Sequence, residues 1–458
     1  MAQCAEDGII AVATANGRGG IGVVRLSGPE AVVRKVFSRM TRVKDPEPRY
    51  AYYAPILDAE GGVIDRGVVI WFKAPHSYTG EDVLEFQAHG NPVILNLIIR
   101  AALEAGGEDG VRLAGPGEFT RRAFMNGMID LAQAESVMDI VNANSEDAVR
   151  AANRSLSGEF STSCGELEEA LIALRTQVEA ILDFPEEEID FMQESRIREQ
   201  TDGIAQKLEE LLKRAGQGNL LREGAVIALV GSPNVGKSSL LNRLSEREVA
   251  IVTDIPGTTR DVIENSILIN GVLIRLVDTA GLRETEDIVE SAGISRALAQ
   301  VENADLVLRV VSCEKPESED GGALAKIRGH LPEGIPVLTV MNKADLLAET
   351  PAAEDGRIWI SAKLGTGIDA LRAAILKKIG YSGSVQSVYL ARRRHVESLK
   401  SARAHAECAR ELLRSPAVQL DLVAEELRMA ARSVGEITGE FSSDDLLGRI
   451  FSSFCIGK

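Results

Sequence analysis

A glycine-rich loop at residues 231–238 has the residue types and spacing of a phosphate-binding site. Its sequence, GSPNVGKS, matches GxxxxGKS and lies between an apolar run at 226–230 and a helix-forming stretch at 239–244. In that context the backbone N–H groups turn inward on the phosphates, and the helix N-terminus adds favourable dipole charge. Lys237 would reach the β- and γ-phosphates, and Ser238 would ligate Mg²⁺. The predicted contacts to a nucleoside triphosphate are Asn234, Val235, Gly236, Lys237, Ser238 and Ser239.

Three further motifs, each at the end of an apolar run, favour guanine as the base. The first, Asp278-Thr279-Ala280-Gly281, would let a carboxylate hold Mg²⁺ through water and a glycine N–H follow the γ-phosphate. The second, Asn342-Lys343-Ala344-Asp345, offers a carboxylate at Asp345 to guanine N1–H and its exocyclic amine, a donor pair that adenine lacks. The third, Ser361-Ala362-Lys363, suits a loop that backs the base. Each motif alone is weak, but four in order indicate a GTP site.

The segment TDIPGTTRD at 253–261 resembles a switch loop that senses the γ-phosphate. A threonine here can complete the Mg²⁺ shell, and we favour Thr259 over Thr258 for this role. Thr259 and Lys237 are then both candidate catalytic residues. Further contacts to the nucleotide are expected from Thr253, Asp254, Ile255, Pro256, Gly257 and Thr258.

Leu282 stands where many small GTPases carry a glutamine that orients the attacking water. Leucine cannot orient water, so another group must do so and must neutralise charge in the transition state. The candidates are an added cation and the acids of the next segment, Glu284, Glu286, Asp287 and Glu290.

The elements that position these residues form an α/β segment inside a helical chain. Between 225 and about 380, strand-like runs alternate with helical stretches, which predicts a mostly parallel doubly wound sheet. The pair Asn270-Gly271 predicts a hairpin between two of its strands. Residues 118–216 and those after 390 are helical by their apolar spacing. We therefore expect a nucleotide domain looped out between two halves of a helical domain.

The chain of 458 residues is predicted to be an α/β and α multidomain protein. The first 120 residues read as a mixed α and β domain, and the run Ala215-Gly216-Gln217-Gly218 as a linker. The expected domains are 1–119 at the N-terminus, 120–217 for the first helical part, 218–381 for the GTPase domain and 382–458 for the second helical part.

Composition narrows the class of protein. The net charge of −17 argues against tight non-specific binding to nucleic acid. The local run Arg392-Arg393-Arg394-His395 is a candidate basic patch, although a solvated helix face is the favoured interpretation. Five widely spaced cysteines indicate neither a zinc site nor a disulfide framework. No run approaches the roughly 18 apolar residues of a membrane span, and no export signal is recognised, so we expect a cytoplasmic protein without membrane association.

Together these residues resemble the bacterial MnmE (TrmE) family of tRNA-modifying GTPases over essentially the whole chain. Each motif alone is weak to moderate, but their order is highly specific. The motifs are GRGGIGVVRLSG, YTGEDVLEFQAHG, GPGEFTRRAF, DLAQAE, DFPEEEIDF, GSPNVGKSSLLN, IVTDIPGTTRD, DTAGLR, LARRRH, EITGEFSSDDLLGRIF and FCIGK.

The resemblance implies an N-terminal α+β domain that binds a one-carbon tetrahydrofolate and dimerises, a discontinuous helical domain, and an inserted Ras-like P-loop GTPase domain. It implies a homodimer that works with a flavin-dependent partner, MnmG, to install an aminomethyl or carboxymethylaminomethyl group on C5 of the wobble uridine of tRNA. It also implies that K⁺ stimulates hydrolysis and that Glu290 orients water. The implied K⁺ ligands are Asn234, Thr253, Ile255 and Thr258.

The same resemblance implies a folate site formed by Arg25, Glu85, the position of Met128, and Lys458. Family members often carry lysine where this chain has Met128, so the chain must manage without that cation or use Arg121 or Arg122.

Cys455 is either a thiol that acts near the one-carbon unit or a small buried side chain, and burial is the favoured interpretation. The alternative function for the whole chain is a ribosome-assembly or RNA-binding GTPase switch without chemistry of its own. Binding of a reduced folate would separate this alternative from the modification enzyme.

Overall fold

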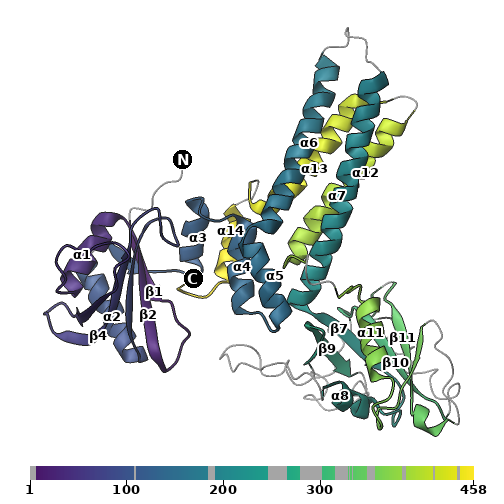
Figure 1. Ribbon diagram of the computed structural model, residues 1–458, viewed down its shortest axis with the longest axis horizontal. Helices are drawn as coiled ribbons and strands as arrows, with labels where there is room; N and C mark the ends of the chain where they lie inside the picture. Colours follow the sequence, from purple (N-terminus) through teal and green to yellow (C-terminus); the bar gives the residue numbers. More distant parts are fainter. Residues whose placement is uncertain are drawn as a thin grey trace. The chain divides into compact units, whose positions relative to one another are not determined.

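The computed structural model describes residues 7–107, 110–183, 191–245, 266–278, 302–314, 329, 331–332, 334–347, 356–383, 388–415, 418–440 and 444–457. The chain divides into two compact units, one of residues 1–138 with 435–458 and the other of residues 139–434. Each unit is built around its own sheet and helices (Figure 1).

The first unit contains a sheet in the order β3-β4-β5-β2-β1-β6, six strands among the described residues. Its core lies between the sheet and two helices, where Phe37, Trp71 and Phe86 are almost fully buried. Asn91 begins the second of these helices, because its side chain accepts a hydrogen bond from the N–H of Val93 at 2.9 Å. The strands are β1 (Gly8–Val12), β2 (Gly19–Gly28), β3 (Tyr52–Leu57), β4 (Val63–Phe72), β5 (Asp82–Gly90) and β6 (Val111–Leu113). The helices are α1 (Glu30–Met40), α2 (Pro92–Gly106), α3 (Glu118–Met125), the first turns of α4 (Leu131–Val141) and α14 (Asp444–Ser452).

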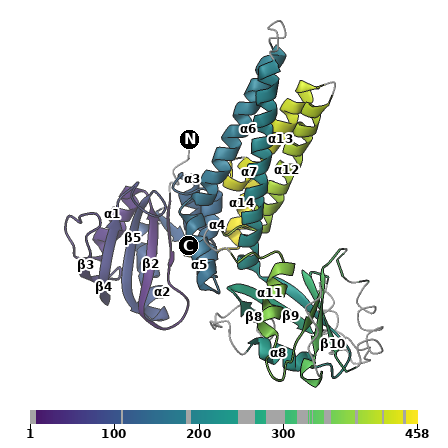
Figure 2. The same ribbon diagram turned by 45° about the vertical axis from the view of Figure 1, so that its right-hand side comes forward.

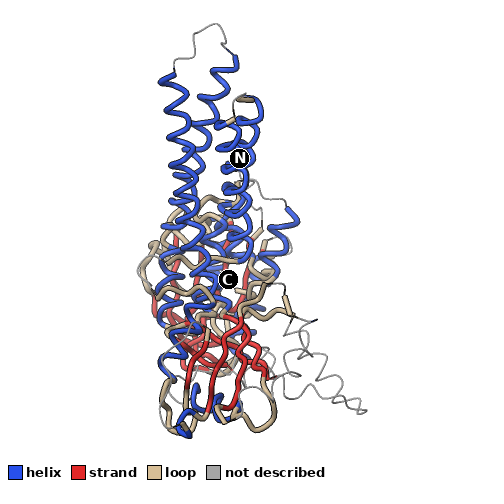
Figure 3. Tube along the Cα trace, turned by 90° about the vertical axis from the view of Figure 1, so that its right-hand side faces the viewer, coloured by secondary structure: helices blue, strands red, loops and turns tan. Residues whose placement is uncertain are grey.

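The second unit contains a bundle of long helices, which run side by side in Figures 2 and 3. The long helices are α6 (Glu159–Asp183), α7 (Phe191–Glu223), α12 (Arg393–Arg414) and α13 (Leu420–Thr438), and the shorter α5 (Glu146–Leu156) contacts α6 and α7. The last turn of α7 leads into a second sheet, and the chain returns to the bundle at α12. The prediction of an α/β segment inserted between two helical segments is therefore confirmed.

Among its described residues, the inserted segment has a six-stranded sheet in the order β12-β11-β10-β7-β9-β8, in which β8 alone is antiparallel to its neighbour. Asn270 and Gly271 both have positive φ, 47° and 80°, as the predicted hairpin between β8 and β9 requires. The elements are β7 (Ala225–Val230), α8 (Lys237–Ser245), β8 (Ser266–Ile269), β9 (Val272–Asp278), β10 (Leu306–Ser312), β11 (Val337–Asn342), η4 (Ala344–Leu346), β12 (Arg357–Trp359) and α11 (Ile368–Lys378).

The linker prediction for residues 215–218 is wrong, because α7 continues through them to Glu223. Gly218 lies so close to the segment before α12 that a Cβ atom would fall 1.6 Å from the carbonyl oxygen of Tyr389. Gln217 also donates a hydrogen bond to the carbonyl of Gly380. The glycines therefore allow close helix packing, and the inserted segment is joined to the bundle by a continuous helix.

The run 392–395 is not a wholly solvated helix face as predicted. Arg392 donates a hydrogen bond at 3.0 Å to the carboxylate of Asp139. The backbone N–H of Arg392 also donates to Nδ1 of His395 at 3.1 Å, and His395 is only 2% exposed. These two residues hold the beginning of α12, whereas Arg393 is exposed.

Candidate functional site

The predicted phosphate loop connects the end of β7 to the beginning of α8. Asn234 and Gly236 adopt left-handed conformations with φ of 66° and 93°. A Cβ atom at Gly231 would lie 2.3 Å from the carbonyl oxygen of Val310, and one at Gly236 would lie 2.3 Å from Nδ2 of Asn342. Because neither position tolerates a larger residue, the two glycines define the path of the loop.

Lys237 is the first residue of α8 and is 7% exposed. Its Nζ donates hydrogen bonds to the carbonyl oxygens of Gly231 at 2.6 Å and Ser232 at 3.1 Å. The ammonium group is thus held within the loop, where it can neutralise phosphate charge. Ser238 and Ser239 lie next to it at the helix N-terminus and are exposed, as ligands of a phosphate or of Mg²⁺ must be.

Asn342 connects the phosphate loop to the loop expected to back the base. It ends β11, is 2% exposed, and donates from Nδ2 to the carbonyl of Val235 at 2.8 Å. Its Oδ1 accepts from the N–H of Ala362 at 3.1 Å. A single buried amide therefore fixes the positions of two loops that are separated by more than a hundred residues in the sequence.

Asp345 lies in the short helix η4 and is exposed. The pKa of its carboxyl is lowered, mainly by a side-chain hydrogen bond from Ser361 and further by the charges of Lys363 and Lys343. Asp345 is therefore an ionised acceptor at neutral pH, as recognition of guanine N–H groups requires. Lys343 has a left-handed φ of 65°, and its Nζ pairs with Glu314 at 3.0 Å.

Several predicted residues lie outside the described residues. These are the switch-loop residues Thr253, Asp254, Ile255, Pro256, Gly257, Thr258 and Thr259, together with Thr279, Ala280, Gly281, Glu290 and Lys458. The backbone of Asp278 is described, and it ends β9 in register with Leu229 of the strand that leads into the phosphate loop.

The residues predicted to bind folate lie in the first unit on adjacent strands. Arg25 of β2 and Glu85 of β5 are direct cross-strand partners. Both Nε and Nη2 of Arg25 donate to Oε1 of Glu85, at 2.9 and 2.8 Å. The guanidinium also lies over the ring of Tyr78, 5.5 Å from its centroid. Sequence reasoning did not assign a role to Tyr78, although it lies within the YTGED motif.

Met128 borders the same loop as Tyr78. It is 40% exposed, and a Cβ atom at Gly80 would lie 3.0 Å from its Cγ. Of the two arginines considered as substitutes for a lysine here, Arg122 is buried and pairs with Asp7, Glu81 and Glu118. Arg121 is exposed and is the better of the two candidates.

The favoured interpretation of Cys455 as a buried packing residue is wrong, because its side chain is exposed. Its backbone carbonyl accepts a hydrogen bond from Gly117 at 3.3 Å, and Ile456 pairs with Pro116 as an isolated bridge. The end of the chain is thus attached to the loop before α3 by its backbone, which leaves the thiol on the surface.

Comparison with known proteins places these sites in a family. The family model described as the GTP-binding protein TrmE N-terminus matches residues 8–128, and the model described as the MnmE helical domain matches residues 131–455. The chain belongs to the MnmE family of tRNA modification GTPases. A relative named tRNA modification GTPase MnmE from Ralstonia nicotianae is 52% identical, over 98% of this chain and 96% of its own. Another of the same name from Nitrosomonas europaea is 51% identical, over 99% of both chains.

Membership in the MnmE family makes this chain a GTP hydrolase, in agreement with its phosphate loop and the Asn342–Asp345 motif. The G domain of a FeoB iron transporter from T. maritima is 26% identical over 34% of this chain and 98% of its own, with a TM-score of 0.25. None of the helices in the described part of the chain is long and apolar enough to cross a membrane.

Proposed function

We propose that this chain is a K⁺-stimulated GTPase that modifies tRNA. With the flavin-dependent partner MnmG it adds an aminomethyl or carboxymethylaminomethyl group to C5 of the wobble uridine, using a one-carbon unit carried by tetrahydrofolate. The observation that carries the proposal is the presence, in one chain, of an MnmE-type N-terminal domain, an MnmE-type helical domain and a guanine-nucleotide site. The chain acts as a homodimer in the cytoplasm, with domains at 1–119, 120–217, 218–381 and 382–458.

The roles in the GTP site follow from the chemistry of each side chain. Lys237 binds the β- and γ-phosphates, Ser238 and Thr259 ligate Mg²⁺, and Glu290 orients water. The cation beside the phosphates is K⁺, held by Asn234 together with Thr253, Ile255 and Thr258, and it supplies the positive charge that an arginine finger supplies elsewhere. The exposed, left-handed Asn234 fits a ligand at the mouth of the phosphate loop.

The roles in the folate site rest on the pair formed by Arg25 and Glu85. A guanidinium suits the carboxylates of the folate tail, and a carboxylate suits the N–H donors of the pterin. Both side chains are partly exposed, at 22% and 15%, so a ligand can reach them. Lys458 is assigned to the same site, and Met128 replaces a cation there with a thioether. Cys455 is a further candidate for this site.

We expect Arg25→Met to weaken binding of a reduced folate by at least about tenfold, because each hydrogen bond to a charged group contributes about 1.5–3 kcal/mol. Equilibrium binding of 5-formyltetrahydrofolate to the full chain measures the effect. The matched control is Arg100→Met on the exposed surface of α2, which should bind as the wild type does. If the wild-type protein fails to bind the folate at high micromolar concentration, the alternative of an RNA-binding or ribosome-assembly switch is favoured instead.

We expect GTP turnover to be faster in KCl than in NaCl at the same ionic strength, because K⁺ is the cation that this site is proposed to hold. Asn234→Ala should abolish the difference between the two salts, whereas Asn303→Ala on an exposed loop should preserve it. Steady-state phosphate release measures both effects. Equal wild-type rates in the two salts would remove K⁺ from the proposal without affecting the GTPase itself.

A further inference from the structure

The tip of the β8–β9 hairpin contacts the beginning of helix α5. The hydroxyl of Ser145 donates a hydrogen bond to the carbonyl oxygen of Gly271 at 2.8 Å. Oγ of Ser145 also accepts a hydrogen bond from the N–H of Ala148 at 3.2 Å and so caps α5. A Cβ atom at Gly271 would lie 2.7 Å from Oδ2 of Asp147, so the tip reaches α5 this closely only as glycine.

Strand β9 connects this tip to the nucleotide site. It pairs in parallel with β7, with Ala225 opposite Ile274 and Leu229 opposite Asp278. Because β7 continues directly into the phosphate loop, the register of β9 determines where Asp278 lies beside that loop. At about 3.3 Å per residue, Asp278 lies roughly 20 Å along the strand from the tip, so a displacement of the tip along β9 also displaces Asp278.

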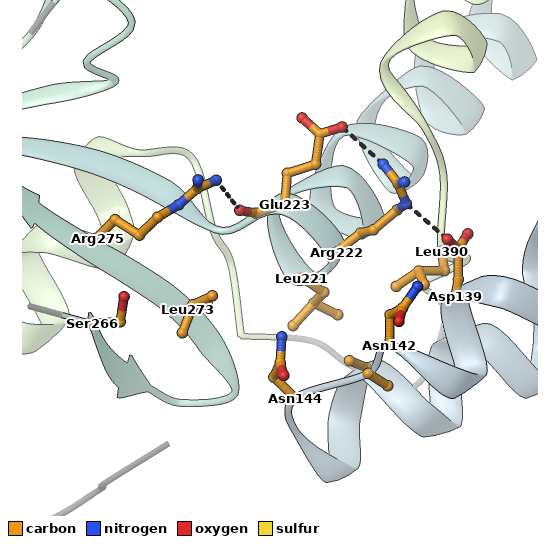
Figure 4. A pocket seen from close by; sticks show the side chains of 12 residues that line it. Asp139, Asn142, Asn144, Leu221, Arg222, Glu223, Ser266, Leu273, Arg275 and Leu390 are labelled. Carbon is orange, nitrogen blue, oxygen red and sulfur yellow. Dashed lines mark hydrogen bonds and ion pairs between the residues drawn. The ribbon is translucent and has the colours of Figure 1, made fainter. Parts of the chain in front are cut away.

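The middle of β9 is held at a second place by helix α7. Arg275 donates from Nη2 to the carbonyl oxygen of Glu223 at 2.8 Å. Figure 4 shows Arg275 and Glu223 on one side of a cavity, with Asn142 and Asn144 near its opposite wall. The cavity has a volume of about 450 Å³. Away from the cavity the hairpin is packed, because Ile269, Val272 and Ile274 are buried in the same apolar cluster as Ala151 and Ala152 of α5. The tip and the strand are therefore displaced together.

On the helical side, Asp139 joins three segments. Its carboxylate, 5% exposed, accepts from Nε of Arg222 at 2.9 Å and from Nη2 of Arg392 at 3.0 Å. The segment that presents Ser145 to the hairpin thus follows directly after an anchored end of α4. Ser145 therefore lies close to an anchored part of the helical segment. Its hydrogen bond to Gly271 positions the hairpin tip from which β9 begins.

We infer that Ser145 is a positioning residue for GTP hydrolysis, which acts through Gly271 and β9 on the carboxylate of Asp278. The inference rests on the proposed Mg²⁺ role of Asp278 in the GTP site. Ser145 touches neither nucleotide nor metal. Its hydroxyl holds the tip of the hairpin to α5, and loss of that hydrogen bond leaves the phosphate loop intact while the backbone of Asp278, at the other end of β9, is held less closely.

The test separates the two roles of the Ser145 hydroxyl. Ser145→Asp keeps the helix cap, because a carboxylate also accepts from Ala148, but it cannot donate to the carbonyl of Gly271. Ser145→Thr keeps both functions and is the matched control. The full-length variants are compared for kcat of GTP hydrolysis, for affinity for fluorescent GDP and for Tm.

We expect S145D to lower kcat by about 2- to 10-fold, which corresponds to the net free energy of one hydrogen bond. GDP affinity and Tm should stay near those of the wild type. S145T should restore the wild-type kcat. Hydrolysis by S145D at the wild-type rate, or a parallel fall of kcat, GDP affinity and Tm, would overturn the inference. Wild-type protein that does not hydrolyse GTP would overturn the proposed function as well, so the two failures are distinguishable.

Discussion

Replacing Lys237 with methionine is expected to reduce GTP hydrolysis by at least about a hundredfold, the typical cost of removing one electrostatic donor from a developing charge. The substitution keeps most of the length and the apolar stem of the side chain, so the packing of this 7%-exposed residue is largely retained. It removes the ammonium group that Gly231 and Ser232 hold within the phosphate loop. Single-turnover hydrolysis at saturating GTP measures the loss of the chemical step, and nucleotide titration measures the loss of binding.

The control for this prediction is Lys213→Met, which removes the same charge from the exposed face of α7. Its rate should match the wild-type rate, since a surface charge far from the loop contributes little. A K237M variant with a wild-type rate would mean that the GTP site lies elsewhere. A K237M variant with a strongly lowered Tm would instead assign Lys237 a structural role in the loop.

The local parts of the nucleotide site could be predicted from the sequence because each depends on a short run of residues. The phosphate loop needs glycines at fixed spacing, and the hairpin needs positive φ at Asn270 and Gly271; both requirements are visible within a few residues. The inserted α/β segment was predictable for the same reason, since its alternating apolar runs are local. The switch loop and Glu290 remain predictions, because they lie outside the described residues.

The parts that could not be predicted depend on partners far away in the sequence. The sequence around Gly216 and Gly218 suggests a linker, although Gly218 packs closely against Tyr389. That partner is far away along the chain, so the local sequence does not reveal it. Arg392 read as solvated because its partner Asp139 lies 253 residues earlier. Arg122 could be separated from Arg121 only once its three carboxylate partners were seen. Composition and periodicity contain no information about such pairs.

Replacing Asp345 with asparagine is expected to reverse the base preference of the site, because an amide offers one acceptor and one donor where the carboxylate offers two acceptors. Guanine would then face a donor with its exocyclic amine, and leaving these polar groups unpaired should weaken GTP binding by at least about a hundredfold. Xanthosine triphosphate carries a carbonyl in place of that amine, so D345N should bind it more tightly than GTP.

Competitive titration of D345N with the two nucleotides measures this switch. The matched control is Asp369→Asn in the first turn of α11, where the side chain is 78% exposed.

The lowered pKa of Asp345 also predicts how the base preference depends on pH. Because a depressed pKa keeps the carboxylate ionised below its ordinary value of 3.8, wild-type guanine preference should be constant from pH 8 to about pH 5 as far as this group is concerned. D345N carries no ionisable group at this position, so any change in its base preference with pH comes from the nucleotide or from other groups. A D345N variant that retained the wild-type preference for GTP would show that guanine is recognised by other groups, and the Asn342–Asp345 motif would then be a structural support for the loop of Ser361 alone.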